Sequence, residues 1–127
     1  MNEFAPSGVY RQHADHPIDA DITVDLGACR EARQVLDRLG TTLDFPDWYG
    51  SNFDALADCL SDPDWRDGAA TLIRLSGLTR FSQQSPGDYA ILLAVLDAAC
   101  QARSEQGAPL AVILEDGPET LPPWLAA

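Results

Sequence analysis

The chain has 127 residues, the size of one domain that can bury its own core without metal or disulfides. Its 20 acidic residues outnumber its 8 basic ones, all of them arginine, so the net charge is −12. A chain with this negative charge repels nucleic acid and anionic membranes, so these are disfavoured as partners. Basic protein surfaces are favoured. No apolar run is long enough to span a membrane, and the first residues lack the pattern of a secretory signal.

The cysteines are consistent with a reducing compartment. Cys29, Cys59 and Cys100 are odd in number and have no C-x-x-C spacing, so we expect reduced thiols rather than a disulfide framework or a redox motif. Together with the composition, this favours a cytoplasmic protein that is a monomer when free.

Residues 1–20 are polar and contain turn residues, so we expect an N-terminal arm outside the core. His13 and His16 flank Asp15, a spacing that a metal site could use. A stable site needs a third strong ligand. We therefore expect a solvated segment, with no metal and no other cofactor.

Residues 21–115 are predicted to form one α/β domain in which strands are separated by helices. The first strand alternates polar and apolar residues, which predicts one buried face. Ser85 and Pro86 suit the cap and first position of a long helix. The expected elements are a strand at 21–26, helices at 28–39 and 52–61, a strand at 70–75, a helix at 86–103 and a strand at 110–116.

Strands separated by helices favour parallel pairing with right-handed crossovers. We therefore expect a three-stranded parallel sheet with helices packed mainly on one face. Gly40 is expected near the end of the first helix. Residues 116–127 are acidic and proline-rich, and we expect them to form a tail.

The helix expected at 52–61 has an apolar and an acidic face. Asp54 and Asp58 are one turn apart, and the repulsion of like charges at this spacing costs a few tenths of a kcal/mol. Ser51 or Asn52 can cap the helix, and the helix dipole favours a carboxylate in its first turn. The i, i+3, i+4, i+7 stripe consists of Phe53, Leu56, Ala57 and Leu60.

An acidic helix face is, on charge alone, most simply a solvated surface. No basic residue occurs between Arg38 and Arg66, and the aromatic pair Trp48 and Tyr49 lies beside the carboxylates. We expect this pair to be exposed. Aromatic side chains next to charge are typical of recognition surfaces, so a binding site is favoured.

The segment WYGSNFDALADCL, residues 48–60, resembles the central segment of the barstar family, small intracellular inhibitors of the ribonuclease barnase. In that family an aromatic pair, a glycine, an asparagine and two aspartates one turn apart fill the nuclease active site. The resemblance extends more weakly over residues 21–115. It implies three parallel strands under a layer of helices, no enzymatic activity, and a basic, toxin-like ribonuclease as partner.

The resemblance assigns partner binding to the aromatic loop, the acidic helix and the link that follows it. Asp58, with Asp54 beside it, would accept charge-assisted hydrogen bonds from the cationic groups that hold phosphate in a ribonuclease. Tyr49, Gly50 and Asn52 would shape the loop. The expected partner-binding residues are Trp48, Tyr49, Gly50, Asn52, Phe53, Asp54, Ala57, Asp58, Asp62 and Trp65.

Some positions depart from the family pattern. Ala57 stands where barstar has a tryptophan, Trp48 replaces the first tyrosine of the pair, and the link after Leu60 is longer. Where barstar contributes a glutamate from its long helix, this chain has Ala102, with Glu105 nearby. These differences leave the identity of the target open.

Three alternatives to a ribonuclease inhibitor remain. The first is a barstar-like module for another basic partner, and the second is an acidic nucleic-acid mimic that sequesters a DNA-binding protein. The third is an enzyme that uses carboxylates. A nucleophile–histidine pair is disfavoured because His13 and His16 both lie in the expected arm, and no glycine-rich phosphate loop occurs. We therefore predict an inhibitor and not an enzyme.

Overall fold

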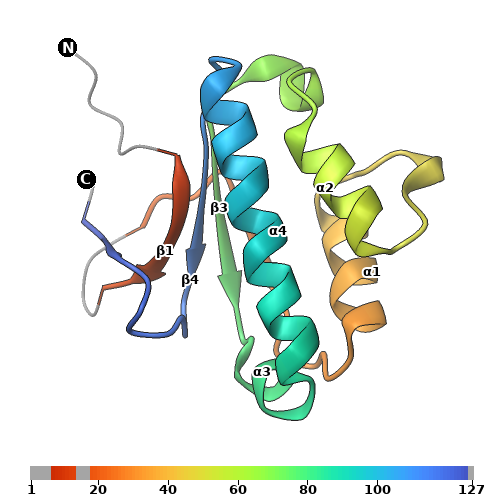
Figure 1. Ribbon diagram of the computed structural model, residues 1–127, viewed down its shortest axis with the longest axis vertical. Coiled ribbons are helices and arrows are strands. Elements are labelled where there is room, and N and C mark those ends of the chain that lie inside the picture. Colours follow the sequence, from red (N-terminus) through yellow and green to blue (C-terminus); the bar gives the residue numbers. More distant parts are fainter. Residues whose placement is uncertain (1–6, 14–17, 126–127) are drawn as a thin grey trace.

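The computed structural model describes residues 7–13 and 18–125 (Figure 1). Five strands in this part of the chain form one parallel sheet in the order β2-β3-β4-β1-β5. β4 lies in the middle and all its residues are buried. The strands are β1 Gly8–Gln12, β2 Ile22–Asp25, β3 Thr71–Ser76, β4 Leu110–Leu114 and β5 Pro123–Trp124.

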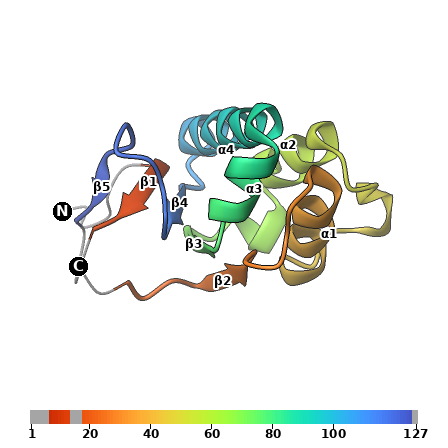
Figure 2. The same ribbon diagram turned by 90° about the horizontal axis from the view of Figure 1, so that it is seen from below.

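The helices cover one face of this sheet (Figure 2). The main core lies between the two layers, where apolar side chains of the helices meet those of β2, β3, β4 and β1. α4 and α2 lie side by side in the helical layer. The α-helices are α1 Ala32–Thr42, α2 Phe53–Ser61, α3 Thr79–Gln84 and α4 Pro86–Glu105, and the 3-10 helices are η1 Asp47–Tyr49 and η2 Trp65–Gly68.

The α/β class, the parallel pairing and the one-sided helical layer agree with the sequence-based expectation, but the expected number of three strands is wrong. β1 comes from the segment expected to be an arm, and β5 comes from the expected tail. Val9 of β1 is buried, while Tyr10 packs edge-on against Trp124 at 5.1 Å between ring centroids. These strands are short and have polar neighbours, so their pattern is weak in the sequence.

The first helix also differs from its expected bounds. α1 begins at Ala32, where Glu31 and Gln34 form a reciprocal capping box. It ends at Thr42, so Gly40 lies near its end, as expected. The absence of a side chain at Gly40 allows close packing, because a Cβ atom there would lie only 2.5 Å from Cε2 of Tyr49.

Two further findings bear on the sequence-based expectations. His13 is exposed, whereas Asp15 and His16, the other residues considered for a metal site, lie outside the described residues. Within residues 7–13 and 18–125, no helix is both long enough and apolar enough to cross a membrane.

Candidate protein-binding site

α2 presents its carboxylates because its opposite side is fixed in the core. Asn52 caps the helix, and its Oδ1 accepts a hydrogen bond of 2.7 Å from the main-chain N–H of Ala55. Leu56 and Leu60 are fully buried against the layer formed with α4. Helical periodicity then leaves Asp54 on the solvent side.

Asp54 and Asp58 are both exposed, one turn apart. Among the residues that the structure describes, neither forms an ion pair, because the ion pairs found there join Arg33 to Asp37, Arg66 to Asp21 and Arg74 to Glu115. The negative charge of this surface is therefore not compensated within the described fold. Four other carboxylates of the loop and the link are also exposed, those of Asp44, Asp47, Asp62 and Asp64.

The aromatic pair divides between surface and core. Trp48 is 61% exposed, as expected, but the expectation that Tyr49 is also exposed is wrong, since only 6% of its surface is accessible. The Tyr49 hydroxyl donates a hydrogen bond of 2.8 Å to the main-chain oxygen of Leu36 in α1. Burial raises the pKa of Tyr49, and the charges of nearby groups add to this effect. Tyr49 thus anchors the loop that carries Trp48.

The chain reverses between the loop and α2 through two left-handed residues. Gly50 has φ +66° and Ser51 has φ +50°, a conformation that is costly for a residue with a side chain. The Ser51 hydroxyl donates a hydrogen bond to the carboxylate of Asp37, and this bond lowers the pKa of Asp37. A second bond to Asp37, from Arg33, acts in the same direction. The loop is therefore bound to α1 through Tyr49 and Ser51, which both follow Trp48 in the chain.

The link after α2 is held in place by contacts with the preceding loop and with α4. Trp65 is half-buried, its Nε1 donates to the main-chain oxygen of Leu43 at 3.4 Å, and its ring lies 5.8 Å from that of Phe45. The guanidinium carbon of Arg103 lies 5.7 Å from the centroid of the Trp65 ring. Asp62 is exposed where α2 ends.

The family profile described as "Barstar (barnase inhibitor)" matches residues 20–115. The chain belongs to the Barstar family. It is also 39% identical over 79 residues to the Bacillus subtilis (strain 168) protein named "Putative ribonuclease inhibitor YrdF", a match that covers 62% of this chain and 80% of that relative. The family resemblance predicted from residues 48–60 is therefore confirmed.

The other predicted site residues of this Barstar-family chain lie around the same helix. Phe53 and Ala57 are half-exposed on α2, and Phe53 packs against the main core. Ala102 is half-exposed on α4, while Glu105 is exposed in its last turn. The structure thus brings the loop, α2 and the link together at the side of the helical layer away from β1 (Figure 1).

Arg103 is the residue of this region that the sequence-based prediction missed. It is fully buried, and burial lowers its pKa, an effect opposed by the negative charge of Asp62. Its position offered a signal, because it falls on the inward stripe of α4 together with Leu92, Leu96 and Ala99. A charged residue on such a stripe indicates a specific set of hydrogen-bond partners.

Proposed function

We propose that this protein inhibits a basic ribonuclease by placing the carboxylates of Asp54 and Asp58 in the active site of that enzyme. The observation that carries the proposal is that both carboxylates are exposed and without ion-pair partners in the described structure, beside the exposed ring of Trp48. The family description and the name of the Bacillus relative support it, since both refer to ribonuclease inhibition.

The chemistry of the proposed target fits this surface. A ribonuclease concentrates cationic and hydrogen-bonding groups around the phosphodiester, and a carboxylate can accept charge-assisted bonds from them. The carboxylates of α2 stand on a capped helix, so little conformational freedom is lost when they bind. A net charge of −12 accelerates association with a basic enzyme at low salt and repels nucleic acid.

The free protein acts as a monomer in this proposal, and we place it in the cytoplasm. All three cysteines are buried and unpaired, which suits a reducing compartment. The protein itself catalyses no reaction.

Ribonuclease inhibition by single-charge variants tests the proposal. RNA cleavage by barnase, and by any small basic ribonuclease encoded beside this gene, is measured with wild type, Asp58→Asn and Glu119→Gln. Glu119 is exposed in the tail, far along the chain from α2, so it is a matched charge control. Loss of one partner of a buried charge pair costs about 2–5 kcal/mol, a range established in part on barnase and barstar and so carried over from this family.

We expect Asp58→Asn to dissociate much faster than wild type, and Glu119→Gln to change only the association rate and its salt dependence, slightly. Equal small losses for the two variants would leave only diffuse electrostatic attraction and refute binding through α2. Binding to a basic protein without ribonuclease activity, and to no ribonuclease, would support the alternative of a Barstar-family module with another target. Turnover by the isolated protein would exclude a pure inhibitor.

A further inference from the structure

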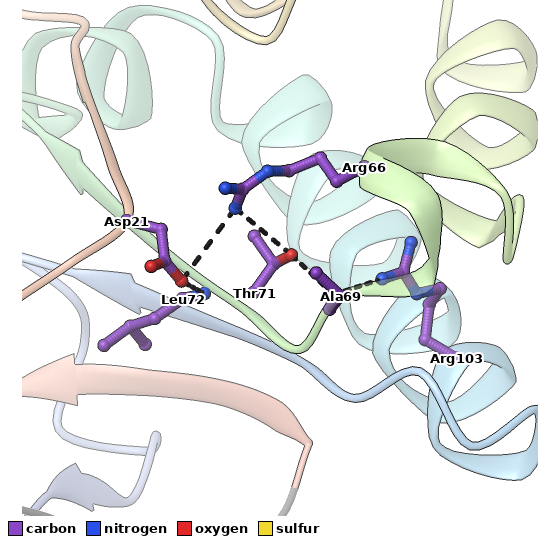
Figure 3. A network of polar contacts seen from close by, with 6 residues as sticks. All are labelled: Asp21, Arg66, Ala69, Thr71, Leu72 and Arg103. Atoms are coloured by element: carbon purple, nitrogen blue, oxygen red, sulfur yellow. Dashed lines mark hydrogen bonds and ion pairs between the residues drawn. The ribbon is translucent and has the colours of Figure 1, made fainter.

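The guanidinium of Arg103 joins three main-chain segments beneath the recognition surface. It donates to the carbonyl oxygens of Ala108 at 2.6 Å, Asp62 at 3.1 Å and Ala69 at 3.2 Å. Asp62 follows α2, Ala69 precedes β3, and Ala108 precedes β4. One side chain of α4 therefore binds both ends of the link between α2 and β3, and Figure 3 shows its contact with Ala69.

The charge of Arg103 is met by these carbonyl dipoles. Within the described part of the chain, no carboxylate forms an ion pair with it, and it is 0% exposed. A buried cation is costly unless its donors are well satisfied, so the positions of the three carbonyls are tightly coupled to it. A shift of Asp62 or Ala69 would leave a buried guanidinium N–H without an acceptor.

The link between α2 and β3 adopts a conformation that needs such support. Arg66 and Asp67 have φ of 56° and 58°, two consecutive left-handed residues that are not glycine. Such conformations persist only where the surroundings determine them. Arg66 supplies part of this support through a hydrogen bond of 3.3 Å to Thr71 and an ion pair of 3.9 Å with Asp21 (Figure 3). Thr71 in turn donates to the carbonyl of Ala69 at 2.9 Å, the same oxygen that Arg103 binds.

We propose that Arg103 is a positioning residue that sets the C-terminal end of the recognition surface, and this inference rests on the proposed function. Besides Ala69, Arg103 contacts Asp62 through the main chain and Trp65 through the ring. The Asp64 N–H donates to Oδ1 of Asp62 at 2.9 Å, so the position of Asp64 follows that of Asp62. Both carboxylates stay exposed beside α2, where they extend the negative surface offered to a basic ribonuclease.

Amide hydrogen exchange tests the positioning without any partner. Arg103→Met keeps an unbranched apolar chain, which is shorter than that of arginine, and removes all donors. Arg103→Lys keeps the charge and cannot form the three-way fork. Ile113→Ala is the control, because it truncates a buried residue in the separate cluster on the other face of the sheet. The informative amides are those of Trp65, Asp67 and Ala69, which are hydrogen-bonded within the link.

We expect these link amides to exchange about tenfold faster in Arg103→Met than the loss of global stability explains, with Arg103→Lys in between. In Ile113→Ala the exchange rates of the link amides should change only as much as those of the sheet amides. Unchanged link exchange in both Arg103 variants would overturn the proposal.

Binding kinetics with barnase, or with whichever ribonuclease the wild type inhibits, give the second readout. We expect Arg103→Met to dissociate about tenfold faster and Arg103→Lys to recover part of that loss, whereas folded Ile113→Ala should bind as wild type does. Faster link exchange with unchanged dissociation would show that the link takes no part in recognition and would overturn the inference while the proposed function stands. If the wild type inhibits no ribonuclease, the proposed function fails, and the exchange result still decides whether Arg103 sets the link.

Discussion

Substitution of Gly40 by alanine tests whether the conformation of the Trp48 loop depends on packing against α1. The added Cβ would lie 2.5 Å from Cε2 and 2.7 Å from Cδ2 of Tyr49, about 1 Å closer than ordinary van der Waals contact. The ring of Tyr49 is buried and its hydroxyl is bonded to Leu36, so it cannot retreat without losing that bond. The helix and the loop are therefore expected to separate locally.

The expected sign is opposite to that of helix propensity. A glycine inside a helix is less stable than alanine by about 0.5–1 kcal/mol, so an unhindered Gly→Ala change is stabilising. At Gly40 the overpacking costs about 1–3 kcal/mol, and loss of the Tyr49 hydrogen bond adds about 1 kcal/mol. The net result is a loss of about 1–3 kcal/mol in the free energy of unfolding.

Gly87→Ala is the matched control for this change. Gly87 lies in the first turn of α4, and a Cβ built there meets nothing within 4 Å. Urea unfolding followed by circular dichroism should show Gly87→Ala at or above wild-type stability and Gly40→Ala below it. Equal stabilities for the two variants would refute the steric role of Tyr49. If the loop is displaced, Gly40→Ala should also alter quenching of Trp48 fluorescence.

Two further predictions concern stability. The division into an arm at 1–20, a domain at 21–115 and a tail at 116–127 stays a prediction. Because β1 pairs with both β4 and β5, we expect deletion of residues 1–12 to lower the midpoint of thermal unfolding sharply. An unchanged midpoint would contradict this expectation. Burial raises the pKa of the Cys100 thiol from 9.0 to about 12, so its contribution to stability is complete below pH 9.0 and lost as the pH rises towards 12. The urea midpoint should fall over that interval, and less so in Cys100→Ala.

Local sequence signals predicted those features that depend on residues close together in the chain. The cap at Asn52 and the acidic and apolar faces of α2 follow from spacing within a few residues. The first strand was predicted from alternation, and the long α4 from helical period. β1 and β5 were not predicted because neither shows an alternating pattern or a long apolar run, and they are held by pairing with β4 and with each other.

Whether Trp48 and Tyr49 are exposed or buried depends on tertiary contacts, which the local sequence pattern does not reveal. Two adjacent aromatic residues look equivalent in the sequence, yet one is exposed and the other is buried. What separates them is a 3-10 turn together with Gly40, against which the ring of Tyr49 packs closely. A glycine at the end of a predicted helix was therefore a signal of close approach, although the sequence did not show which residue approaches.

The contacts of Arg103 were also beyond what the local sequence pattern predicts. An arginine on the inward stripe of a helix predicts buried acceptors, but those acceptors are main-chain carbonyls at residues 62, 69 and 108, and carbonyl groups leave no trace in residue identity. The longer link after α2 and the buried cation depend on each other, because the link supplies two of the three carbonyls. A change in link length without Arg103, or Arg103 without this link, would leave unsatisfied polar groups in the core. The two features are therefore expected to be retained or lost together, and exchanging either one alone should destabilise the fold more than exchanging both.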